Sequence, residues 1–239
     1  MMQIGMREAA GLLGVPEKTL MKWIRDDSLP AVKVGGQFRF NRTELLEWAT
    51  SRQIPVSSEL FSTEKRDGES CAAGLRRAIQ AGGIRYDVPG TDRHSVLEHT
   101  LGLMPIPGDI DRAFLLQVLE AREDLSSTGI GDGIAIPHVR NPIVLSIPEP
   151  MITLAFLEKS VEFGAIDGRP VHTLFMMISP TVNSHLDILS RLAFALRQPA
   201  FMGAVSMRCR GGEILDQAGR IDDMLASRAN PCRRSDPCK

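Results

Sequence analysis

The stretch STGIGDGIAIPH, residues 127–138, places three glycines directly before a short apolar segment that ends in Pro137 and His138. Glycines let backbone N–H groups approach an anion because no Cβ stands in the way. The proline stiffens the backbone before the histidine, and an imidazole is nucleophilic near neutral pH. The stretch therefore predicts a phosphate held beside an imidazole. The residues expected to bind this phosphate are Thr128, Gly129 and Gly131.

Two residues outside this stretch are candidates for the same site. Arg122 continues the apolar stripe of a predicted amphipathic helix over residues 109–121. It can reach solvent or cap its own helix, but beside the glycine run it can also neutralise phosphoryl oxygens. His185 follows Ser184, the expected cap of a later helix, and falls on that helix's apolar face. It is either a core histidine or a second imidazole that donates to a phosphoryl oxygen at the positive helix end.

The chain from about residue 71 alternates between helical and strand patterns, which predicts an α/β domain with a mostly buried sheet. Helices are expected over residues 72–81, 92–103, 109–121 and 184–196, and strands over residues 84–88, 134–136, 152–157 and 171–178.

The first 53 residues have a different pattern, of three short helices with a two-stranded wing. A first helix over residues 6–13 ends at Gly14, and Pro16 suits the first position of the second. Residues 31–40 predict a tight hairpin around two glycines. Asn41 is expected to open a third helix, with Glu44 completing a capping box.

Composition excludes several classes of protein. The apolar fraction of 43% supports a buried core, and the net charge of −1 means that any contact with nucleic acid needs a local basic patch. No apolar run approaches the roughly 20 residues of a membrane span, and no signal peptide is evident, so we expect a cytoplasmic protein without membrane insertion. No metal site or cofactor is expected. Free thiols are expected at Cys71, Cys209, Cys232 and Cys238.

Polar stretches without a sustained period suggest where the domains end. The expected organisation is a winged domain over residues 1–53, a linker over 54–70, an α/β domain over 71–228 and a disordered tail over 229–239.

Residues 127–138 resemble the active-site signature of enzyme IIA domains of the bacterial phosphotransferase system, in the fructose, mannitol and nitrogen-regulatory class. The resemblance covers roughly residues 72–228 and implies the enzyme IIA type 2 fold, a mixed β-sheet flanked by helices. It implies that His138 accepts a phosphoryl group from an HPr-like phosphocarrier. The family's active-site arginine corresponds to Arg122, and its second histidine corresponds to His185. A chain active in this way is a transferase.

One residue departs from that family's pattern. The family usually has a small residue after the active histidine, whereas this chain has Val139. A β-branched side chain there restricts the backbone, and we expect it to crowd the approach of a partner protein.

Residues 3–50 resemble the excisionase and MerR-like winged helix-turn-helix domains, which place their second helix in the major groove of DNA. Eight basic residues oppose six acidic ones over residues 1–53, a net charge of +2, so tight DNA binding is expected to need a homodimer. The alternative is a module that docks on a protein. The residues expected to contact DNA are Lys18, Thr19, Lys22, Arg25, Lys33 and Arg39.

Three functions follow from these two resemblances. The first is a nitrogen-regulatory-type regulator in which phosphorylation of His138 controls a DNA-binding domain. The second is a sugar-branch enzyme IIA that passes its phosphoryl group to a IIB domain during carbohydrate uptake. The third is an interaction protein whose winged domain binds a regulatory target protein instead of DNA.

Overall fold

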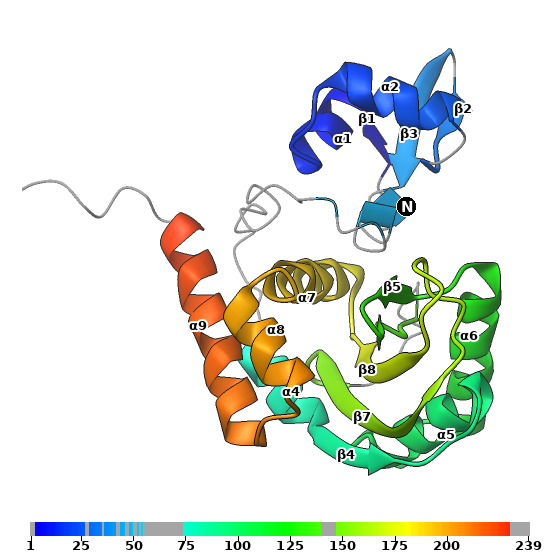
Figure 1. Cartoon of the computed structure of the whole chain (residues 1–239). Coiled ribbons are helices and arrows are strands. Elements are labelled where there is room, and N and C mark those ends of the chain that lie inside the picture. Colours follow the sequence, from blue (N-terminus) through cyan, green and yellow to red (C-terminus); the bar gives the residue numbers. More distant parts are fainter. Residues whose placement is uncertain are drawn as a thin grey trace, which may run out of the picture.

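The computed structural model (Figure 1) describes residues 3–26, 29–34, 36–41, 44–45, 48–49, 52, 54, 74–139 and 147–229. The predicted linker and tail lie outside these residues, apart from Ile54 and Ala229. Within the described part, no helix is both long and apolar enough to cross a membrane.

The N-terminal domain has two short helices packed on a three-stranded antiparallel sheet. Its elements are β1 (Gln3–Gly5), α1 (Met6–Leu12), α2 (Glu17–Arg25), β2 (Val32–Val34) and β3 (Gln37–Asn41). The hairpin β2–β3 is the predicted wing, and residues 44–45 and 48–49 are helical, as expected for a third helix. Gly14 ends the first helix with a φ of 61°. Pro16 is the N-cap of α2, one position earlier than predicted.

The larger domain is built on a mixed five-stranded sheet with the order β4-β7-β8-β6-β5. Its strands are β4 (Ile84–Val88), β5 (Gly129–Gly131), β6 (Ile134–Ala135), β7 (Met151–Val161) and β8 (Val171–Ile178). The pairs β4–β7 and β6–β8 are parallel, whereas β7–β8 and β5–β6 are antiparallel.

Helices cover both faces of this sheet (Figure 1). They are α4 (Leu75–Gly82), α5 (Arg93–Leu103), α6 (Arg112–Leu125), α7 (Val182–Ala195), α8 (Pro199–Ser206) and α9 (Gly211–Ala229). Because side chains alternate along a strand, β7 sends Ile152, Leu154 and Phe156 into the core under α7–α9, and Ala155 and Leu157 into the core under α5 and α6.

Two predicted helix starts were wrong by a few residues. Helix α7 begins at Val182, with Thr181 as its N-cap. Ser184 is the third helical residue, and its side chain accepts a hydrogen bond from the backbone N–H of Thr181. Helix α6 begins at Arg112, because the side chain of Asp111 accepts hydrogen bonds from the N–H groups of Ala113 and Phe114.

Candidate functional site

The sheet brings residue 138 and the start of α7 to the same edge. Strands β6 and β8 run parallel, and His138 extends their pairing through a bridge to Met177, whose N–H donates to the Pro137 carbonyl at 2.8 Å. Helix α7 follows β8 after a short turn, so its positive N-terminus lies at the carboxyl ends of both strands. Ligands bind at this end of parallel strands in many α/β proteins.

The two histidine rings face each other at this edge. His138 and His185 are 4% and 2% exposed, and their ring centroids lie 5.2 Å apart. Nδ1 of His138 lies 2.7 Å from the carbonyl oxygen of Ile136. A carbonyl can only accept a hydrogen bond, so Nδ1 carries the proton and the neutral ring has its lone pair on Nε2. Nε2 is therefore the nucleophilic nitrogen.

Arg122 lies in the last turn of α6 and is only 7% exposed. Its Nη1 donates to the carbonyl and hydroxyl oxygens of Ser126, the C-cap residue of that helix, at 2.8 and 3.2 Å. The arginine thus caps its own helix and lines the same cavity as His138. Capping of the helix end and a place on the cavity wall are therefore compatible for Arg122.

Glu123 is a buried residue beside the site that sequence reasoning missed. Its buried carboxylate accepts hydrogen bonds from the Thr128 N–H at 2.6 Å and from the Thr128 hydroxyl at 2.7 Å. This pair ties the end of α6 to the start of the glycine run.

The glycines of that run form a tight hairpin between β5 and β6. Gly131, Asp132 and Gly133 have φ values of 99°, 51° and 72°, a region that favours glycine. A Cβ on Gly133 would lie 2.3 Å from Nε2 of His172, so the hairpin packs tightly against β8.

Two backbone N–H groups of the predicted phosphate cradle have partners within the protein. The N–H of Thr128 already donates to Glu123, and the N–H of Gly129 donates to the Ser127 hydroxyl at 3.0 Å. Both residues line the cavity, but these two N–H groups are engaged within the protein. A phosphate-binding role for Thr128, Gly129 and Gly131 stays a prediction.

The expectation for Val139 is also corrected. Its side chain is 6% exposed and belongs to the core under α5 and α6. Since neighbouring side chains point to opposite sides of an extended segment, His138 faces the cavity and Val139 faces the core. Val139 therefore does not crowd the approach to His138.

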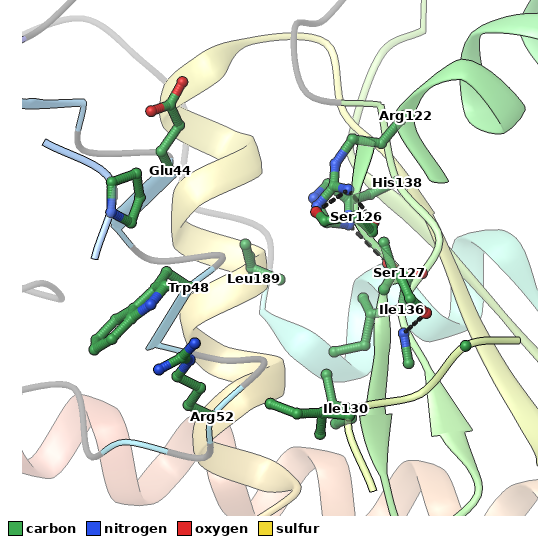
Figure 2. Close-up of a pocket in the computed structure, with 15 residues that line it drawn as sticks. Glu44, Trp48, Arg52, Arg122, Ser126, Ser127, Ile130, Ile136, His138 and Leu189 are labelled. Carbon is green, nitrogen blue, oxygen red and sulfur yellow. Dashed lines mark hydrogen bonds between the residues drawn. The ribbon is translucent and has the colours of Figure 1, made fainter. Parts of the chain in front are cut away.

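The cavity beside His138 has a volume of about 440 Å³. Figure 2 shows Arg122, Ser126 and His138 on one side of it and Glu44, Trp48 and Arg52 of the N-terminal domain on the other.

The remaining histidines have other partners. Nδ1 of His94 contacts Glu120, that of His99 contacts the Ser95 carbonyl, and that of His172 contacts the Thr173 hydroxyl. Burial lowers the pKa of His172, whereas Glu120 raises that of His94. Among the described residues, no cluster of His, Cys, Asp or Glu has the arrangement of a metal site.

The predicted DNA-contacting residues lie on the outside of the N-terminal domain. Lys18, Lys22 and Arg25 are exposed on α2, while Thr19 is half-buried. Lys33 is exposed on β2, and its Nζ lies 5.9 Å from the ring centroid of Phe38. Arg39 is half-buried on β3. A role for these residues in binding DNA stays a prediction.

Comparison with known families accounts for both parts of the chain. Residues 78–217, more than half of the chain, match the family described as phosphoenolpyruvate-dependent sugar phosphotransferase system, EIIA 2. The chain belongs to this family. Residues 5–53 match a family described as helix-turn-helix domain. The predicted families are confirmed, and the two parts are called the HTH and EIIA domains below.

Individual proteins show the same relationship. A nitrogen regulatory protein of Pseudomonas aeruginosa is 35% identical over 126 residues, 51% of this chain and 79% of that protein. A fructose-specific EIIA component of Haloferax volcanii is 32% identical over 116 residues, 47% of this chain and 73% of that protein. The crystal structure of the nitrogen regulatory protein IIA-Ntr of Neisseria meningitidis superposes with a TM-score of 0.51 at 26% identity, covering 58% of this chain and 94% of that one. The mixed α/β fold is thus the predicted one.

Proposed function

We propose that this chain is a nitrogen-regulatory-type EIIA protein that accepts a phosphoryl group on Nε2 of His138 from an HPr-like phosphocarrier. The observation that carries the proposal is the pair of facing imidazoles, with the proton of His138 held on Nδ1 by the Ile136 carbonyl. This arrangement presents a nucleophilic nitrogen of defined tautomer beside a second imidazole and a buried guanidinium.

The transfer needs a nucleophile and groups that stabilise the charge of the phosphoryl oxygens. Nε2 of His138 attacks the phosphorus of the donor's phosphohistidine, and the donor's N–P bond breaks as the new N–P bond forms. Arg122 and the imidazole of His185 stabilise the charge on the phosphoryl oxygens, together with the positive N-terminus of α7. We propose these three as the catalytic residues.

Incubation with phosphoenolpyruvate, enzyme I and an HPr-type phosphocarrier tests this function. We expect one acid-labile phosphoryl group per chain in the wild type and none in His138→Ala. His94→Ala is the matched control, because His94 is an exposed imidazole on α5 and should not affect labelling. Labelling that survives in His138→Ala would contradict the proposal.

A regulatory role is favoured over sugar uptake by the HTH domain on the same chain and by the similarity to nitrogen regulatory proteins. We infer that phosphorylation is the input: by analogy with phosphoserine it adds about −1.5 to −2 charge, which changes docking between the domains, blocks a partner surface or repels DNA. The protein is proposed to act in the cytoplasm.

The second candidate is transfer to a IIB domain, which the similarity to fructose-specific EIIA components favours. Mixing the phosphorylated chain with a fructose-type IIB domain distinguishes the two roles. Movement of the label from His138 to IIB would support uptake, and label that stays on His138 supports regulation.

We propose that the HTH domain binds DNA through the exposed side of α2, as a homodimer. Replacing both Lys22 and Arg25 by Ala should weaken binding to random duplex DNA about tenfold and reduce its salt dependence. Arg220→Ala is the control, since Arg220 is exposed on α9. A mobility shift that survives the double replacement would contradict the assignment of α2 to the DNA groove, and a wild type that gives no shift would favour the protein-docking alternative.

A further inference from the structure

The cavity over His138 is bounded by both domains. Arg122 and His138 line it on the EIIA side, and Glu44, Trp48 and Arg52 line it on the HTH side (Figure 2). The guanidinium of Arg52 lies 5.0 Å from the ring centroid of Trp48. Trp48 in turn packs on Trp23 with a centroid distance of 5.1 Å. The HTH wall of the cavity is therefore anchored in that domain's own core.

An apolar contact next to His185 joins the two domains. Leu186 is 8% exposed and belongs to the buried cluster of the HTH domain, together with Leu45 and Trp48. Ile188 and Leu189 on the same helix instead belong to the EIIA core. Leu186 thus uses its apolar surface to hold the HTH domain, and the EIIA core does not depend on it.

We propose that the HTH domain is a removable cover on the phosphoacceptor face, and that it competes with the protein phosphodonor for the surface around Leu186. The inference rests on the proposed function. Transfer between two histidines needs the donor imidazole in line with Nε2 of His138, which brings the donor protein's surface against the rim of the cavity. A cavity of about 440 Å³ admits a small phosphate compound but no protein surface. The cover must therefore leave before a protein donor reaches His138.

The cover hides the phosphate site without hiding the face expected to bind DNA. Helix α2 lies on the side of the HTH domain that is away from α7 (Figure 1). Its cationic side chains, Lys18, Lys22 and Arg25, are exposed in the covered arrangement.

The test uses the full chain and two phosphodonors of different size. Leu186→Gln replaces the apolar contact by a neutral polar group, which weakens docking without adding charge near the phosphoryl group. Val182→Gln is the matched control, because Val182 lies one turn earlier on α7 and is 43% exposed. Leu186→Met, which keeps an apolar side chain of similar size, should behave as the wild type.

We expect Leu186→Gln to raise the rate of phosphorylation by an HPr-type donor about tenfold, the factor that corresponds to about 1.4 kcal/mol. The rate with phosphoramidate, which is small enough to enter the cavity, should change less than about twofold, because only a protein donor must displace the cover. The tryptophan emission should also shift to the red, since both tryptophans of the chain lie in the HTH domain and Trp48 faces the cavity.

The outcomes separate this inference from the proposed function. Suppose that the wild type accepts phosphate but that Leu186→Gln changes neither the rate nor the emission spectrum. That result would overturn the proposed cover and leave the proposed function intact. Failure of both donors to label any of the chains would remove the proposed function and the competition with it. An equal rise in Val182→Gln would show that the effect is not specific to the docked contact, and would also overturn the cover.

Discussion

At the scale of single residues, Glu123 of the buried pair Glu123 and Thr128 lies next in sequence to Arg122, the arginine proposed to stabilise the phosphoryl group. Both carboxylate oxygens of Glu123 are bonded to Thr128, through its N–H and its hydroxyl. Arg122 holds the Ser126 carbonyl from the same helix turn. The segment between the helix and the glycine run is therefore fixed by two adjacent side chains.

Thr128→Val tests the Glu123 contact directly. It keeps the shape of the side chain but removes the hydroxyl donor, which leaves one oxygen of a buried carboxylate without that bond. We expect the free energy of unfolding in urea to fall by about 1–3 kcal/mol. Thr91→Val, at an exposed position, should cost less than about 0.5 kcal/mol. Equal stabilities of the two variants would contradict a structural role for this pair.

At the scale of elements, the β5–β6 hairpin depends on its close approach to β8. In Gly133→Ala the new Cβ meets His172 and the backbone keeps a positive φ, so we expect a loss of about 1–3 kcal/mol in unfolding free energy. In the double variant Gly133→Ala with His172→Ala, the clash between the new Cβ and the imidazole is removed. The share of the lost unfolding free energy that this clash causes should therefore be recovered. A double-mutant cycle with no coupling between the two positions would contradict this packing.

The same hairpin is held by an acid-sensitive contact to the β7–β8 loop. The Asp167 carboxylate accepts from the N–H groups of Asp132 and Arg169, at 2.9 and 3.1 Å, and these bonds hold its pKa below the usual value. Because the pKa of Asp167 is lower in the folded chain than in the unfolded chain, its carboxylate stabilises the fold at pH values above the unfolded pKa. This stabilisation is lost as the pH falls through the folded pKa.

Carboxyl NMR titration should therefore place Asp167 below an ordinary aspartate, and protection of the Asp132 amide should fall with it on acidification. Asp167→Asn should lack this acid-dependent step. An Asp167 that titrates at or above the usual aspartate pKa would show that the contact does not form.

The sequence predicts the helices and strands whose apolar residues repeat at a regular spacing. It misses the elements and helix ends that are set by contacts with other parts of the chain. Strand β1 is too short to show alternation and exists because it pairs with β3. Thr181 and Ser184 are both capping residues that bond each other, so sequence alone cannot tell which one starts α7. Helix α9 is not among the helices expected from the sequence, although its apolar residues have helical spacing. Ile214, Ala218, Ile221 and Leu225 lie on one buried face.

The candidate site was predictable to a similar degree. His138, Arg122 and His185 were singled out from the motif and from helical spacing; the fold places Arg122 and His138 on one cavity and the ring of His185 against that of His138. Glu123 was missed because it falls at a polar position of α6, and only the return of residues 126–128 over the helix end buries it. The hairpin geometry of the glycine run likewise depends on contacts with β8 and its preceding loop.

At the scale of the whole molecule, two domains share one cavity, and His138, the proposed phosphoryl acceptor, lies at its EIIA wall. In the proposed cover, the HTH domain restricts access of the protein donor to His138, and phosphorylation of His138 in turn requires the HTH domain to leave the cavity. The domain boundaries given from sequence stay predictions, as does the homodimer.

The proposed phosphoryl acceptor is a single atom, Nε2 of His138. Phosphorus–proton correlation NMR of the chain phosphorylated by an HPr-type donor identifies which ring nitrogen carries phosphorus, and mass spectrometry of peptides identifies the residue. We predict one phosphoryl group, on Nε2 of His138, because the Ile136 carbonyl keeps the proton on Nδ1. A phosphoryl group on Nδ1 of His138, on His185, or on no histidine of the chain would contradict the account.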